Sequence, residues 1–140
     1  MARTSAGIDW QASVLGATAV PSGQTGTLGV GYMAPANYIA LSADTATPNS
    51  SDTTLPGELG PSSSPASTGL ARKQATYAHT TGTNTYTLTT TFTSDTTVTV
   101  AKIGVFNASS AGVLFAETLL SSSISLHSGD TIQITETISL

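Results

Sequence analysis

The closing stretch Thr131-Ile132-Gln133-Ile134-Thr135-Glu136-Thr137-Ile138-Ser139-Leu140 carries the strongest fold signal in the chain. Successive side chains on a β-strand point to opposite faces. The isoleucines and Leu140 therefore share one face, and the Gln, Thr and Ser residues share the other. The apolar face is predicted to pack in the core, and the polar face is predicted to contact solvent. The run from Thr85 to Phe92 alternates in the same way and predicts a second half-buried antiparallel strand.

Composition agrees with one small all-β domain. The chain has 140 residues, a length typical of a single domain. Only 9% of its residues are charged, against about 25% in an average soluble protein. Ser and Thr together number 45. Because threonine is β-branched and keeps a wet face without charge, this composition favours strands exposed on one side.

Charge and cysteine content exclude several functions. The net charge is −4 and the four basic residues form no stripe, so we expect no nucleic-acid binding. The chain lacks cysteine, so it cannot use disulfides or thiolate metal sites. No segment approaches the roughly 20 apolar residues that span a bilayer, and the N-terminus lacks the apolar run of a signal peptide. We expect a protein made in a cytoplasm, without a membrane partner.

The chain divides into two predicted parts. Residues 1–36 are rich in Gly, Ser and Thr from Val20 to Gly31 and are predicted to form an N-terminal arm, with a short helix near 8–15, that folds onto a neighbour. Residues 37–140 are predicted to form a single antiparallel β-sandwich-like domain, which we expect to be complete. A long Pro- and Ser-rich loop at 43–69 interrupts it.

Strands are predicted along the second part from alternation and turn residues. The first, 37–42, is apolar on both faces and is expected to be covered on both sides. Others are expected at 70–80, 86–92, 98–105, 113–120 and 132–140, with polar turns between them. The apolar parity shifts between Val100 and Ile103, which predicts a β-bulge.

Candidate catalytic and metal-binding groups are few. The two histidines, His79 and His127, lie among Ser and Thr, where a nearby hydroxyl carries no information. Glu117 and Glu136 could approach each other if their strands pair, but Lys102 offers a simpler partner in a salt bridge. We expect no enzyme and no catalytic residue.

Oxygen ligands for Ca²⁺ are present in the long loop, where Asp44, Asp52 and Glu58 accompany Asn49. Their spacing lacks the dense alternation of an EF-hand loop. We therefore expect no metal site and no cofactor.

Several segments resemble bacteriophage virion proteins, namely small capsid-associated proteins and the collar-like domains of tail fibres. The most specific are Ala101-Lys102-Ile103-Gly104-Val105-Phe106-Asn107-Ala108 and Gly112-Val113-Leu114-Phe115-Ala116-Glu117-Thr118. The others are Tyr38-Ile39-Ala40-Leu41-Ser42, Leu55-Pro56-Gly57-Glu58-Leu59, Leu70-Ala71-Arg72-Lys73-Gln74-Ala75-Thr76-Tyr77 and Ser128-Gly129-Asp130. The resemblance covers about residues 37–140 and implies a β-sandwich-like virion component without catalytic residues. Tail-fibre members often carry an acidic residue where this chain has Lys102.

These observations lead to one expected function and two alternatives. We expect a head decoration or minor capsid protein, located in the virion, that cements adjacent capsomers. Its partners would be the major capsid protein and copies of itself in a homo-oligomer. The first alternative is a tail-fibre or baseplate attachment protein; its anchoring domain would normally continue into a shaft, whereas this chain ends at Leu140.

The second alternative, a glycan-binding module, needs an aromatic platform. Trp10 is the only tryptophan and lies outside the predicted sheet. The other aromatic residues weighed for such a platform are expected in the core: Tyr77, Tyr86, Phe92, Phe106 and Phe115. Partner contacts are expected in the arm, at Trp10, Tyr32 and Met33, and in the long loop, at Leu55 and Glu58.

Overall fold

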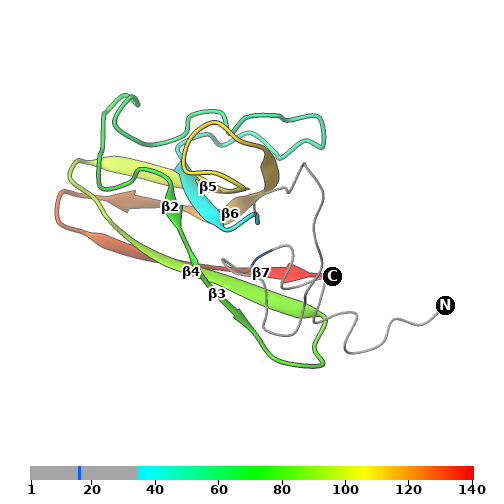
Figure 1. Ribbon diagram of the computed structural model, residues 1–140. Coiled ribbons are helices and arrows are strands. Elements are labelled where there is room, and N and C mark those ends of the chain that lie inside the picture. Colours follow the sequence, from blue (N-terminus) through cyan, green and yellow to red (C-terminus); the bar gives the residue numbers. More distant parts are fainter. Residues whose placement is uncertain (1–15, 17–34) are drawn as a thin grey trace.

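The computed structural model describes Gly16 and residues 35–140 (Figure 1). Its strands form two antiparallel sheets, as the sequence predicts. The four-stranded sheet has the order β2-β1-β5-β6, and the three-stranded sheet has the order β3-β4-β7. The strands are β1 (Tyr38–Ser42), β2 (Lys73–Gln74), β3 (Thr76–His79), β4 (Thr85–Thr93), β5 (Val98–Phe106), β6 (Leu114–Leu126) and β7 (Thr131–Ser139).

The last four strands form one long antiparallel ribbon that is folded over at its middle. Thr93 of β4 pairs with Thr131 of β7, and Val98 of β5 pairs with Leu126 of β6. The step from Thr93 to Val98 has the same number of residues as the step from Leu126 to Thr131. The pairing register of β4 with β7 therefore continues unchanged into the pairing of β5 with β6. The backbone N–H of Ser94 donates to the Asp130 carbonyl at 2.8 Å inside that corner. Figure 1 shows the β5–β6 half lying over the β4–β7 half.

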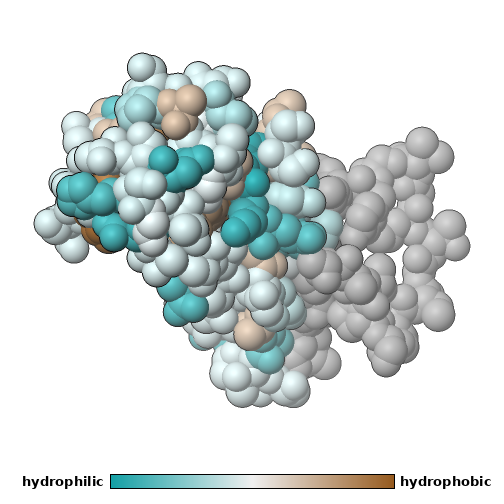
Figure 2. Space-filling model, turned by 90° about the vertical axis from the view of Figure 1, so that its left-hand side faces the viewer, coloured by the Kyte–Doolittle hydropathy of each residue, from teal (hydrophilic) through white to brown (hydrophobic). Residues whose placement is uncertain are grey.

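The core lies between the two halves, on the faces that alternation predicts. Ile132 and Ile134 of β7 are buried, as are Tyr86, Leu88 and Phe92 of β4. The odd-numbered residues of both strands face outward, and Thr89 and Thr135 lie 3.1 Å apart, hydroxyl to hydroxyl, whereas Thr90 is buried on the inward face. On the side of the molecule seen in Figure 2, most atoms are pale and the strongly hydrophilic ones are scattered. This side of the molecule therefore presents mainly residues of intermediate hydropathy, such as Ser and Thr, rather than strongly hydrophilic ones.

Two details of the strand predictions are confirmed. β1 pairs with β2 on one side and β5 on the other, and four of its five residues are buried. The pairing of β5 with β6 shifts register between Val100 and Lys102, which is the predicted bulge.

Two other details are wrong. The predicted strand at 70–80 is two short strands in different sheets, because the chain crosses between the layers at the buried Ala75, whose N–H donates to the Asn37 carbonyl at 2.8 Å. β6 continues past Leu120 to Leu126. Residues 121–125 are exposed, so they show no apolar alternation, although part of this stretch pairs with β5.

The predicted helix at 8–15 lies outside the described residues. Within the predicted arm, Ala36 is buried in the main core. Gly16 is also buried, and a Cβ added to it would lie 2.6 Å from a ring carbon of Tyr86. In the part of the chain that the structure describes, no helix is long and apolar enough to cross a membrane.

Candidate functional site

The long loop covers the outer face of the four-stranded sheet. Leu59 donates its N–H to the Leu41 carbonyl at 2.8 Å, so the loop returns along β1. Leu55 packs with Ala40 and Phe106 in a second apolar cluster on this outer face. Gly104 makes the close approach possible, because a Cβ there would lie 2.9 Å from a methyl carbon of Leu55. We call this surface, formed by residues 43–59 over β1, β5 and β6, the loop-covered face.

A buried lysine joins the loop to two strands. The Lys102 side chain is only 1% exposed, and its Nζ lies 2.6 Å from Oδ2 of Asp44 and 3.5 Å from Oε2 of Glu117. The first contact is a charge-assisted hydrogen bond, and the second is an ion pair too long for one. The hydrogen bond with Asp44 raises the pKa of Lys102 and holds the pKa of Asp44 below its ordinary value. Both groups therefore stay charged at neutral pH.

This arrangement settles the two roles considered for Glu117. Lys102 is its partner, as the sequence predicts. The approach of Glu117 to Glu136 does not occur through strand pairing, because β6 and β7 belong to different sheets. The strand pairing on which a glycosidase-like carboxylate pair depends is therefore not present.

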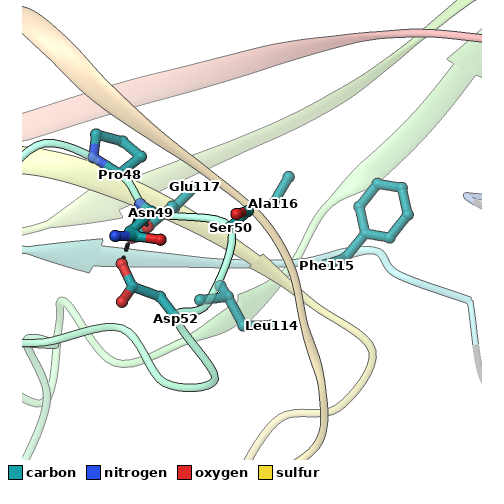
Figure 3. A pocket seen from close by; sticks show the side chains of 8 residues that line it. All are labelled: Pro48, Asn49, Ser50, Asp52, Leu114, Phe115, Ala116 and Glu117. Atoms are coloured by element: carbon teal, nitrogen blue, oxygen red, sulfur yellow. Dashed lines mark hydrogen bonds between the residues drawn. The ribbon is translucent and has the colours of Figure 1, made fainter.

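An open cleft of about 290 Å³ lies between the loop and the start of β6 (Figure 3). Glu117 Oε1 and Asp52 Oδ2 both accept the backbone N–H of Asn49, at 3.0 and 3.1 Å. Figure 3 shows Phe115 directed away from these carboxylates. None of the lining residues is His, Lys or Arg: they are Pro48, Asn49, Ser50, Asp52, Leu114, Phe115, Ala116 and Glu117. The cleft offers acceptors and apolar surface but no nucleophile paired with a base.

Arg72 fastens the second half of the loop-covered face. Its guanidinium makes two hydrogen bonds to the Glu58 carboxylate, at 3.0 and 2.8 Å. It also donates to the carbonyls of Ala108 and Ala111 in the loop between β5 and β6. The guanidinium carbon lies 3.4 Å from the ring centre of Phe106, a cation–π contact. One side chain that is 8% exposed thus connects three segments.

Asp95 holds the far end of the long loop at the corner of the ribbon. Its carboxylate accepts hydrogen bonds from the hydroxyls of Ser67 and Thr68 and from the N–H of Thr68 and Gly69. The Ser67 and Thr68 hydroxyls, which contribute most, hold the pKa of Asp95 far below its ordinary value. Gly69 is required here, because a Cβ would lie 1.9 Å from the Thr93 carbonyl oxygen.

Exposed apolar side chains gather along β6. Phe115 is 43% exposed, Leu119 37% and Ile124 40%, and Val113 just before the strand is 58% exposed. β6 is an edge strand of its sheet. We call β6 together with Val113 the β6 edge.

The five residues predicted to contact partners are placed as follows. Trp10, Tyr32 and Met33 lie outside the described residues. Leu55 is 4% exposed and packs inside the chain. Glu58 pairs with Arg72 and keeps 29% of its side chain exposed.

Most of the aromatic placements are confirmed. Tyr86, Phe92 and Phe106 are buried, and Tyr77 packs against the core. The core placement of Phe115 is wrong, because the second register shift, near Phe106, places it at the exposed edge.

The loop carboxylates and the histidines take separate partners. Asp44 binds Lys102, Asp52 binds the Asn49 N–H, and Glu58 binds Arg72. Among residue 16 and residues 35–140, no group of three His, Cys, Asp or Glu side chains is arranged to hold a metal ion. His79 Nδ1 lies 2.8 Å from the Thr85 carbonyl oxygen.

No protein-family model matches the chain, and no curated protein is similar to it.

Proposed function

We propose that this protein is a non-enzymatic structural component of a bacteriophage virion that binds the outside of the assembled shell and stabilises adjacent capsomers. One observation carries the proposal. Most of the segments that resemble phage virion proteins contribute residues to the loop-covered face or to the contacts that fasten it. They supply Glu58, Arg72, Lys102 and Glu117, whose ion pairs fasten the loop to the sheet.

The loop-covered face is suited to binding a partner through a complementary shape. Its loop is fixed by buried ion pairs and by the cluster of Leu55, Ala40 and Phe106. A surface that is already ordered loses less conformational entropy when a partner binds it. A cement protein acts in this way, since it gains its effect from area buried against neighbouring subunits rather than from chemistry.

The environment of Lys102 favours decoration over the tail alternative. An acidic residue here, as tail-fibre members often have, would put a third carboxylate beside Asp44 and Glu117. Those two carboxylates lie 2.6 and 3.5 Å from the Lys102 ammonium. Like charges this close repel, so the loop would not be held in the same way. A tail-fibre or baseplate attachment protein is the second candidate function.

Binding to purified shells tests the proposal. Shells assembled without this protein are mixed with it, sedimented and analysed for bound protein, with purified tails as the parallel sample. We expect saturable binding to shells and none to tails. Binding to tails alone would establish the second candidate function, and binding to neither would overturn both.

A matched pair of variants tests which face binds. Ser50 lies at the cleft of the loop-covered face, and Thr137 lies on the outer face of the three-stranded sheet; both are exposed. Ser50→Arg is expected to weaken shell binding at least tenfold, and Thr137→Arg to leave it unchanged. The reverse pattern would show that the loop-covered face is not the one that binds.

A further inference from the structure

Three titratable side chains meet on the loop-covered face, and each comes from a different segment of the chain. Lys102 lies on β5 and pairs across the sheet with Ser42, the last residue of β1. Asp44 follows Ser42 by two positions, and its N–H donates to the Ser42 hydroxyl at 2.9 Å. Glu117 on β6 pairs with Gly104, so it is a diagonal neighbour of Lys102, within reach of long side chains. Strand register thus brings an amine between two carboxylates.

The Lys102 amine and the Asp44 carboxylate are close enough to react. Lys102 Nζ lies 2.6 Å from Asp44 Oδ2, which places it beside the carboxyl carbon that carries this oxygen. Reacting groups held in contact behave as if one were present at a concentration of about 10⁵–10⁸ M in favourable cases. The Lys102 side chain is 1% exposed, and its strand is paired on both sides, so the amine is held in this position.

Glu117 places a proton acceptor on the other side of the amine. Its Oε1 accepts the Asn49 N–H at 3.0 Å, which orients the carboxylate. Its Oε2 is buried, accepts no hydrogen bond from any residue that the structure describes, and lies 3.5 Å from Lys102 Nζ. A carboxylate oxygen with unused acceptor capacity beside an ammonium is suited to take a proton from it.

We propose that Lys102 and Asp44 form an intramolecular amide bond, an isopeptide crosslink, with Glu117 as the general base. The ammonium gives a proton to Glu117, and the freed lone pair of Nζ attacks the carboxyl carbon of Asp44. One C–O bond of that carboxyl group breaks, and Glu117 passes protons from the nitrogen to the departing oxygen, which leaves as water. The three ammonium protons end as one amide N–H and two protons of water, so the step needs no co-reactant. Glu117 ends as a carboxylate, and each chain reacts once.

Burial favours the neutral product over the ion pair. The hydrogen bond between the two side chains raises the pKa of Lys102 and lowers that of Asp44, so the ion pair is the state before reaction. Burial opposes both shifts, because removing charges from water is costly. An amide replaces both charges with one neutral group. Asp44 is 24% exposed, so the released water has a path to solvent.

This inference goes beyond the proposed function, because it concerns a covalent bond within one chain. Its test uses the isolated full-length protein, so the outcome does not depend on shell binding. Intact mass spectrometry of the denatured protein is expected to give a mass one water molecule lower than that of the same chain without the bond. A folded protein that keeps the full mass would overturn the inference.

Tryptic digestion locates the bond. Trypsin cleaves after lysine and arginine, and the chain has four such residues, which are Arg3, Arg72, Lys73 and Lys102. A lysine whose amine is part of an amide is not cleaved. We therefore expect a product in which fragments 4–72 and 74–140 are linked. Separate fragments 74–102 and 103–140 would show a free Lys102 amine and would overturn the inference even if the intact mass were low.

Variants test the parts played by Glu117 and Asp44. Glu117→Gln keeps the size of the side chain but removes the proton acceptor, and general acid–base catalysis contributes about 10²–10⁴-fold. After equal times we expect a linked fraction at least tenfold lower than in wild type. Glu136→Gln, on β7 of the other sheet, is the matched control and should link as wild type does.

Asp44→Ala removes the carboxyl group that is attacked, and it should give no linked product. Circular dichroism checks that each variant is folded, and the wild-type mass decides whether the bond forms even if a variant does not fold. Equal linking in folded Glu117→Gln would refute its role as the base. Linking of Lys102 in Asp44→Ala would refute Asp44 as the group attacked.

Discussion

Lys102 Nζ lies 2.6 Å from Asp44 Oδ2, although 58 positions separate the two residues in the chain. Asp44 belongs to the long loop and Lys102 to β5, while Glu117 on β6 lies on the other side of the ammonium group. The lysine is buried and lies within ion-pair distance of both carboxylates, so these contacts fasten the loop to two strands at once. They give the loop-covered face its fixed shape.

Replacing the lysine should destabilise the fold. In Lys102→Met the Glu117 carboxylate, which is 7% exposed, loses its cation. Removing one partner of a buried ion pair leaves an uncompensated charge and costs about 3–5 kcal/mol, so we expect the free energy of unfolding in urea to fall by that amount. Lys73→Met, at an exposed position on β2, is the control and should change it by less than about 0.5 kcal/mol. Equal effects of the two substitutions would contradict the structural role of Lys102.

Arg72 should not tolerate lysine. Lysine keeps the charge but cannot make the two parallel hydrogen bonds to Glu58. It also lacks the planar guanidinium that Arg72 stacks on Phe106. We expect Arg72→Lys to lower the free energy of unfolding by about 1–3 kcal/mol, measured by urea denaturation. The reciprocal change Lys73→Arg, at the neighbouring exposed residue, should have little effect. An unchanged midpoint for Arg72→Lys would show that charge alone fastens the loop.

Asp95 should make stability depend on acid pH. Its pKa is far below the ordinary value of 3.8 in the folded state, so it binds fewer protons there than in the unfolded state. Its contribution to stability is therefore complete above about pH 4 and is lost as the pH falls below that value. In Asp95→Asn this contribution is absent at every pH. We expect the urea midpoints of wild type and variant to differ at pH 7 and to converge toward pH 2; a constant difference would contradict this assignment.

Glu136 should act in the opposite direction. It lies on the inward face of β7, and burial raises its pKa above the ordinary value of 4.5, while a hydrogen bond with the Thr118 side chain opposes the shift. The folded state then favours the protonated acid, so stability falls as the pH rises above about 4.5. Glu136→Gln copies the protonated form. Its urea midpoint is expected to exceed that of wild type at pH 7 and to equal it near pH 4; a lower midpoint at pH 7 would contradict this account.

Alternation in the sequence predicts the two sheets because each long strand has one apolar face. It predicts β4 and β7 well, and the parity shift after Val100 locates the bulge in β5. The prediction of one strand at 70–80 fails. This run mixes apolar and polar residues, so the sequence gives no sign that the chain crosses between the two sheets at Ala75. The same parity that buries Ile132 and Ile134 also places Glu136 on the inward face, and the sequence shows this parity.

The candidate site was harder to predict than the fold. The sequence predicts Lys102 as the partner of Glu117. It does not predict the shorter contact with Asp44, because the two residues are 58 positions apart and no periodic pattern connects them. The contacts of Arg72 and Asp95 depend likewise on where a long loop returns. Alternation places Phe115 in the core, because it does not show the register shift near Phe106 that leaves this residue 43% exposed.

Copy number in the virion tests the proposed function most directly. Quantitative mass spectrometry of purified virions, with heads separated from tails, measures this chain relative to the major capsid protein. We predict that the protein is found in the head fraction at a copy number that is a simple fraction or multiple of that of the major capsid protein. Its absence from heads, or its confinement to a few copies in the tail fraction, would contradict the role in shell stabilisation.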